Sequence, residues 1–100
     1  MNKRTKATSI SMTVRAKVFN RDGQHCFKCG SYQNLETAHY ISRANAGKGI
    51  EQNLAMMCHS CHYEYDFTPN RKAIAEEFRK YLDDLYPGFD HEDRFYKKGG

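Results

Sequence analysis

Apolar residues follow a helical spacing most clearly near the C-terminal end of the chain. Between residues 70 and 86 they share one face of a helix, at Ile74, Phe78, Tyr81, Leu82 and Leu85. Pro87 and Gly88 follow directly and are typical of a helix end. We therefore predict a C-terminal helix over residues 70–86.

Two shorter apolar stretches predict strands. The first runs from Leu35 to Ile41 and the second from Leu54 to Met57. The stretch Ser42 to Gln52, which contains Gly47 and Gly49, is expected to form the loop between them.

Shorter helices are expected on either side of these strands. Thr13 can cap a helix that runs through Phe19 and carries Val14 and Val18 on one face. Another helix is expected from His59 to about Phe67, before Pro69. The mixture of helices and strands predicts the α+β class.

The first eleven residues, MNKRTKATSIS, are polar and basic and have no periodicity. We expect residues 1–11 to form a disordered basic arm and residues 12–100 to form a single domain. A chain of 100 residues buries a modest share of its surface, so an additional covalent or metal link is expected to stabilise it.

Charge is unevenly distributed along the chain. The formal net charge is +4. Residues 1–21 carry basic side chains and no acid, whereas seven of the twelve acidic residues fall between Glu76 and Asp93. An uncompensated basic segment favours contact with a polyanion such as nucleic acid. A solvated basic tail without a partner is the alternative reading.

Two C-x-x-C pairs, formed by Cys26, Cys29, Cys58 and Cys61, predict a structural zinc site. Four thiolates complete a tetrahedral shell and leave no open position for catalysis.

No apolar run is long enough for a signal peptide or a membrane span, so we expect a cytoplasmic protein. A reducing compartment favours zinc over the alternatives, two disulfides or four unrelated thiols. His25 and His59 lie beside these cysteines and are weaker candidate ligands.

The residues around the cysteines are more specific than the cysteines themselves. Arg21-Asp22-Gly23 precedes the first pair, a predicted strand contains His39, and Asn53-Leu54 precedes Cys58 to His62. This order resembles the HNH endonuclease family in its form with two C-x-x-C pairs, over about residues 14–67. The resemblance is greatest to the small HNH proteins of phages and prophages.

The resemblance implies a small zinc-stapled ββα-metal (His-Me) finger with flanking helices, and it implies roles for three residues. His39 would act as the general base on water, Asn53 would orient it, and His62 would hold a catalytic divalent cation such as Mg²⁺, Mn²⁺ or Ni²⁺. The chemistry agrees, because a neutral imidazole can accept a proton near pH 7 and phosphoryl charge needs a cation. Asp66, at i+4 from His62, is a candidate second ligand.

One position departs from the family pattern. Many relatives carry Asp or His, a ligand of the catalytic metal, directly before the general base, whereas this chain has Ala38. Glu36 lies on the same strand face and is a candidate replacement, as is water. If Ala38 removes a ligand, Ala38→Asp is expected to tighten metal binding and increase cleavage.

The function that the resemblance implies is that of a metal-dependent HNH endonuclease, and we expect it to hydrolyse DNA with low sequence specificity. The candidate contacts to DNA phosphates are Arg43, Lys48 and, in the basic arm, Lys3, Arg4 and Lys6. Two alternatives remain open: a non-catalytic zinc-finger module that binds nucleic acid or a protein, and a nuclease for branched DNA. A larger phage packaging or recombination protein is a possible partner for so small a domain.

Overall fold

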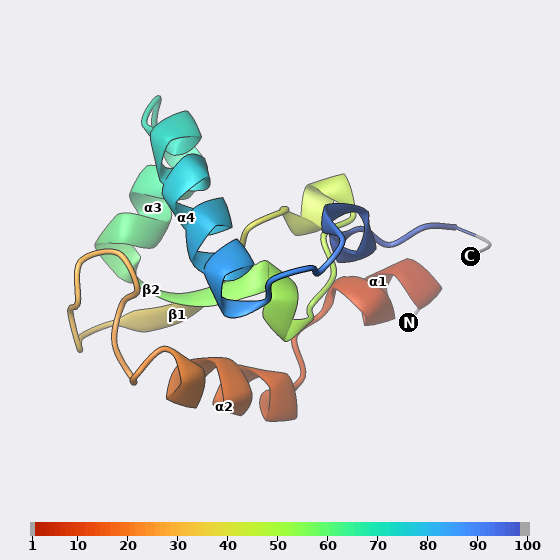
Figure 1. The fold of residues 1–100 in the computed structure, drawn as a ribbon, viewed down its shortest axis with the longest axis horizontal. Helices are drawn as coiled ribbons and strands as arrows, with labels where there is room; N and C mark the ends of the chain where they lie inside the picture. The colour runs from red at the N-terminus through yellow and green to blue at the C-terminus, as the bar shows by residue number, and fades with distance from the viewer. Residues whose placement is uncertain (1, 99–100) are drawn as a thin grey trace.

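A hairpin of two antiparallel strands lies at the centre of the chain, between helices that come before and after it in the sequence (Figure 1). The structure is a computed structural model and describes residues 2–98. In chain order the elements are α1 (Lys3–Thr8), α2 (Met12–Arg21), β1 (Leu35–His39), β2 (Leu54–Cys58), α3 (His59–Phe67) and α4 (Arg71–Leu85), with short 3₁₀ helices at Arg43–Asn45, Glu51–Asn53 and His91–Arg94.

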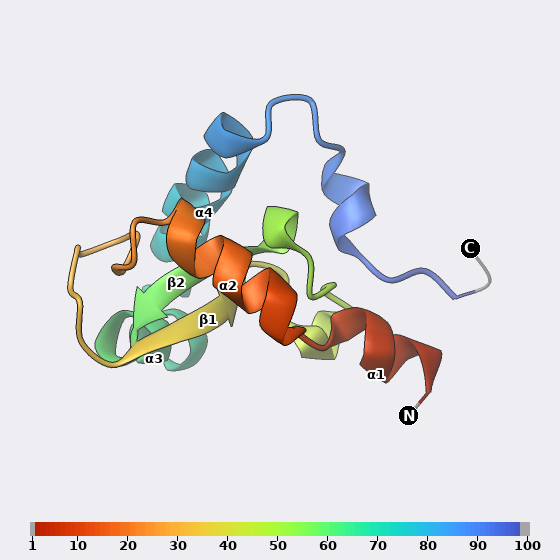
Figure 2. The same cartoon turned by 90° about the horizontal axis from the view of Figure 1, so that it is seen from below.

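Helices cover both faces of the hairpin. Side chains alternate along a strand, so Leu54 and Met56 of β2 point to one face, where they pack with Val18 of α2. Ala55 and Met57 point to the opposite face, where α3 and α4 supply Tyr65, Ile74, Phe78 and Leu82. Figures 1 and 2 show α2 and α4 on opposite sides of the strands. All five residues of β2 are therefore buried, which explains why this strand is apolar throughout.

The C-terminal helix agrees closely with the sequence prediction. α4 runs from Arg71 to Leu85, and Ile74, Phe78 and Leu82 on its apolar face are buried. Leu85 is an exception, because it remains 38% exposed where the helix ends. Beyond α4, the side chain of Arg94 is completely buried and donates to the main-chain oxygen of Gln52 at 2.7 Å.

Helix α2 is longer than the predicted helix at both ends. Ser11, not Thr13, is the cap: its hydroxyl accepts a hydrogen bond from the main-chain N–H of Val14 at 3.1 Å. Both Ser11 and Thr13 are good capping residues. The pattern alone therefore did not distinguish between them.

Strand β1 ends at His39 instead of continuing to Ile41. The main-chain N–H of Tyr40 donates to the main-chain oxygen of Asn53, and that of Ile41 donates to the Asn53 side chain. These two bonds replace the continuation of the strand ladder. The chain therefore turns away directly after His39.

The expectation of a disordered arm is wrong for residues 3–8, which form α1; Met1 lies outside the described residues. Asn2 caps this helix by accepting a bond from the N–H of Thr5 at 2.7 Å. The Thr8 side chain is buried, and the main-chain oxygen of Ala7 accepts a bond from Gly49. Main-chain and polar contacts hold α1 against the protein, so no apolar periodicity reveals it in the sequence.

These observations confirm the α+β class and the ββα order of β1, β2 and α3. Over the described residues, every helix is too short or too polar to span a bilayer.

Candidate functional site

The four cysteines meet at one end of the hairpin. One sulfur atom from each of Cys26, Cys29, Cys58 and Cys61 lies within 4.8 Å of the other three, and those of Cys29 and Cys58 are 3.6 Å apart. A disulfide needs about 2.0 Å, whereas two thiolates on one tetrahedral zinc ion lie roughly 3.8 Å apart. The group therefore fits a single zinc ion and does not fit two disulfides.

The thiols are also electrostatically suited to a cation. Burial acts to raise the pKa of Cys26, but hydrogen bonds from the main-chain N–H groups of Cys29, Cys58 and Lys28 outweigh it and lower that pKa to about 7. Burial and the neighbouring thiols raise the pKa of Cys61. Four thiolates can share this space only if a cation offsets their repulsion.

The neighbouring histidines make other contacts. His25 Nδ1 lies 2.9 Å from the main-chain oxygen of Cys26, and His59 Nδ1 lies 2.9 Å from a carboxylate oxygen of Glu36. In the described part of the chain, the four cysteines form the one group of three or more metal-ligating side chains close enough to share an ion.

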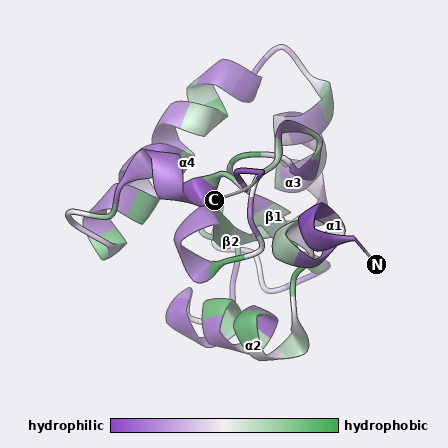
Figure 3. Ribbon diagram, turned by 90° about the vertical axis from the view of Figure 1, so that its right-hand side faces the viewer, coloured by the Kyte–Doolittle hydropathy of each residue, from purple (hydrophilic) through white to green (hydrophobic). Residues whose placement is uncertain are grey.

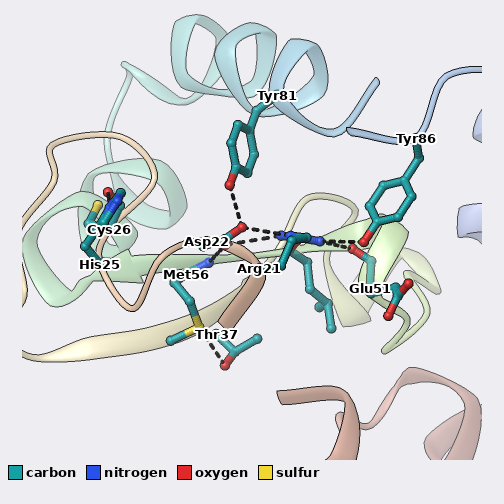
Figure 4. Close-up of polar contacts among 10 residues, drawn as sticks. Arg21, Asp22, His25, Cys26, Thr37, Glu51, Met56, Tyr81 and Tyr86 are labelled. Atoms are coloured by element: carbon teal, nitrogen blue, oxygen red, sulfur yellow. Dashed lines mark hydrogen bonds and ion pairs between the residues drawn. The ribbon is translucent and has the colours of Figure 1, made fainter. Parts of the chain in front are cut away.

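A buried carboxylate fixes the turn that leads into the first cysteine pair (Figure 4). Asp22 accepts hydrogen bonds from the N–H of Met56 at 2.7 Å and from the hydroxyl of Tyr81, and it forms an ion pair with Arg21 at 2.8 Å. Arg21 also donates to the main-chain oxygens of Glu51 and Leu54.

These contacts join α2, β2 and α4 around one residue. In the sequence, Arg21-Asp22-Gly23 is visible only as part of the family motif. The signal it contained was an acidic residue directly after a basic one at a helix end, but its buried partners lie far away in the sequence.

His39 is half-buried at the end of β1, on the face opposite Ala38. Its Nε2 atom lies 3.0 Å from the main-chain oxygen of Thr8, at the end of α1. Burial lowers the pKa of His39, the bond to Thr8 opposes this change, and the positive charge of Arg43 lowers the pKa further. His39 is therefore predominantly neutral near pH 7.

The side chain of Asn53 joins both ends of the loop between the strands. It accepts from the N–H of Ile41 at 2.9 Å and donates to the main-chain oxygens of Ile41 at 3.1 Å and Lys48 at 2.9 Å. It is completely buried. These side-chain to main-chain bonds fix the backbone two residues after His39.

His62 lies on α3 between two carboxylates. Its Nδ1 atom is 2.7 Å from Glu36, and its Nε2 atom is 3.0 Å from Asp66. The two carboxylates contact different nitrogen atoms of the His62 ring, so His62, Glu36 and Asp66 do not surround a single metal position in this arrangement. β1, which ends at His39, packs against α3, which carries His62.

Ala38 is completely buried with Tyr65 and Phe78. A carboxylate at this position would lose its hydration, so Ala38→Asp carries a stability cost that the sequence did not reveal. Glu36 shares the strand face of Ala38 and contacts His62.

The candidate DNA contacts differ in their exposure and in the charges around them. Lys3, Arg4 and Lys6 are exposed on α1, and Arg43 is exposed at the start of the loop. Lys48 is half-buried beside Glu92 and Asp93, which makes its surroundings less favourable for a phosphate. The chain thus presents most of these cations on the side where α1 meets the loop.

The fold and site define a small α+β protein with a ββα unit and a four-cysteine cluster that can hold a metal ion. Searches with protein-family models and among curated proteins found no match. Among solved structures, the chain resembles the type IV phosphorothioation-dependent restriction endonuclease ScoMcrA, with a TM-score of 0.63 and 17% identity. The match covers 85% of this chain and 17% of that one, so the likeness shows a shared fold with one part of a much longer enzyme.

Proposed function

We propose that this protein is a metal-dependent endonuclease of the HNH type that hydrolyses DNA phosphodiester bonds. The observation that carries the proposal is a ββα unit framed by the cysteine cluster, in which the hairpin carries His39 and the following helix carries His62 between two carboxylates. The shared fold with a restriction endonuclease supports it.

His39 has the chemistry of a general base. A carbonyl oxygen can only accept a hydrogen bond, so the contact with Thr8 requires the proton of a neutral His39 to be on Nε2. Its Nδ1 atom then keeps a free lone pair that can accept a proton from water. The bonds made by Asn53 keep the backbone beside His39 in place.

His62, Asp66 and Glu36 offer the nitrogen and oxygen donors that divalent cations bind. A bound Mg²⁺, Mn²⁺ or Ni²⁺ ion would stabilise the negative charge that develops on the phosphoryl group. One carboxylate has to leave the His62 ring for such an ion to bind it. We therefore assign His62 and Asp66 as the primary ligands and Glu36 as the residue that compensates for Ala38.

The four cysteines would hold a structural zinc ion that links the loop at Cys26 to the junction of β2 and α3. This link fixes the start of the helix that carries His62 and Asp66. Phosphate contacts from α1 and Arg43 would give affinity without base recognition, and hence low sequence specificity.

Plasmid cleavage tests the proposal. Purified wild type and His39→Ala are incubated with supercoiled plasmid and Mg²⁺, Mn²⁺ or Ni²⁺. We expect wild type to nick the plasmid with at least one metal and the variant to lose this activity. Binding without nicking in every metal would instead support the non-catalytic zinc-finger module.

A further inference from the structure

A basic cleft lies between α1 and the C-terminal segment, which are far apart in the sequence. It has a volume of about 750 Å³ and is lined by Asn2, Lys3, Arg4, Ala46, Tyr96 and Lys98. Figures 1 and 3 show α1 beside this segment, and in Figure 3 α1 is largely hydrophilic.

Hydrogen bonds hold both walls of the cleft to the loop that follows His39. The Arg4 guanidinium donates to the main-chain oxygens of Arg43 at 3.3 Å and Ala44 at 2.9 Å. The N–H of Tyr96 donates to the main-chain oxygen of Ala46 at 2.7 Å. The cleft is therefore a built feature of the fold and not a gap between loose ends.

The lining is positively charged and uncompensated. None of the six lining residues is acidic. Within residues 2–98, the side chains of Lys3, Arg4 and Lys98 form no ion pair, whereas Lys97, which precedes Lys98, pairs with Glu92 at 3.9 Å. The cations of α4 differ, because Arg79 and Lys80 each pair with an aspartate one turn away. A basic cleft without internal counter-charge attracts an anion.

Tyr96 adds an aromatic surface to these cations. It is half-buried, lines the cleft, and its ring forms no stacking pair with another ring in the described part of the chain. Proteins that bind single strands combine cations for the backbone with aromatic rings on which bases stack. A base in a duplex is already stacked and paired, so only an unpaired strand can offer a base to this ring.

We propose that this cleft binds one nucleotide unit of a single nucleic-acid strand. Lys3, Arg4 and Lys98 contact the phosphate, and the base stacks on Tyr96. The inference rests on the proposed function for its substrate class. It adds that the strand is unpaired on this side of the cleavage site.

The distance between the cleft and His39 fits the binding of a strand that continues to the cleavage site. α1 carries Lys3 and Arg4 at one end and Thr8, the partner of His39, at the other. Six helical residues span about 9 Å, so the cleft would hold the strand a few nucleotides away from a phosphate at His39.

The test measures binding in the absence of cleavage. Zinc-loaded protein carrying His39→Ala is titrated, without added divalent cations, against a fluorescent twelve-nucleotide oligothymidine and against a duplex of equal length. We expect the single strand to bind more tightly. Tyr96→Ala should weaken single-strand binding by about fivefold to 150-fold and leave duplex binding unchanged, whereas Tyr96→Phe should keep it.

Salt dependence tests the cations separately. Lys3→Ala and Lys98→Ala should each reduce the slope of log affinity against log salt by about 0.7 for the single strand. Lys72→Ala, an exposed lysine on α4, serves as the matched control and should not change it.

Unchanged single-strand affinity in Tyr96→Ala would overturn the proposal. Displacement of the bound oligothymidine by polyglutamate as effectively as by unlabelled oligothymidine would also overturn it, because polyglutamate has charge but no bases. The two proposals fail independently. Plasmid nicking together with unchanged single-strand affinity in Tyr96→Ala refutes only the cleft. Selective single-strand binding without cleavage of either the plasmid or a single-stranded oligonucleotide refutes only the nuclease.

Discussion

The Nε2 atom of His39 lies 3.0 Å from the main-chain oxygen of Thr8, although thirty-one positions separate the two residues. A basic segment that was expected to be disordered therefore supplies the contact that sets the proton position on the proposed base. Burial under this segment also makes the charged form of His39 less favourable.

The pH dependence of cleavage follows from this burial. A general base works in its neutral form, and the pKa of His39 is lowered from its ordinary value of 6.5. Activity should therefore persist below pH 6.5 and fall only as the pH drops through the lowered pKa. The measurement is kcat/KM for plasmid nicking against pH at constant metal. An acidic limb above pH 6.5 would contradict this assignment.

Gly49→Ala should reduce cleavage without removing any charged group. A Cβ atom at Gly49 would lie 2.0 Å from the main-chain oxygen of Ser9, so the chain directly after Thr8 must move. Because small displacements of catalytic groups are costly, we expect a loss of up to about a hundredfold in single-turnover rate.

Gly88→Ala is the control for Gly49→Ala. It also introduces a side chain at a glycine, where φ is +85°, but nothing lies within 4 Å of the new atom. This variant should lose some stability and keep its cleavage rate. Equal rates in the two variants would show that the position of α1 does not matter for His39.

Zinc removal should unfold the domain. We expect one zinc ion per purified chain, and chelation should abolish the folded circular dichroism spectrum because the cysteine cluster joins the Cys26 loop to α3. Cys58→Ser should also lose zinc. His59→Ala should retain it, since His59 contacts Glu36. A folded, zinc-free wild type would refute the structural role of the site.

Asp22→Asn should be strongly destabilising. It leaves Arg21 largely buried without its counter-charge and weakens the bonds to Met56 and Tyr81. We expect a loss of about 3 kcal/mol or more in the free energy of unfolding, measured by urea denaturation of zinc-loaded protein. Asp84→Asn, which breaks an exposed ion pair on α4, should have little effect. Similar losses in both variants would show that burial of Asp22 is unimportant.

The sequence predicted features that depend on local pattern. The apolar face of α4, the strands that begin at Leu35 and Leu54, and the order of the two cysteine pairs were all visible in it. Each depends on spacing along a short stretch of chain.

Features that depend on distant partners were not visible. Asn2 caps α1 without any apolar signal, and Arg94 is buried against Gln52 and Asp83, which lie on two other segments. The position of Ala38 was noted as the departure from the family pattern. Its complete burial follows from the packing of α3 and α4, which no local pattern encodes.

The most direct test of the proposed function compares three histidines in one cleavage assay. His39→Ala, His62→Ala and the control His91→Ala are each verified for zinc content and folding, and their single-turnover rates on one DNA substrate are measured beside wild type. The account predicts losses of about a hundredfold or more for His39→Ala and His62→Ala, and a rate close to wild type for His91→Ala. Comparable rates in all three variants, or no metal-dependent cleavage by the wild type, would contradict it.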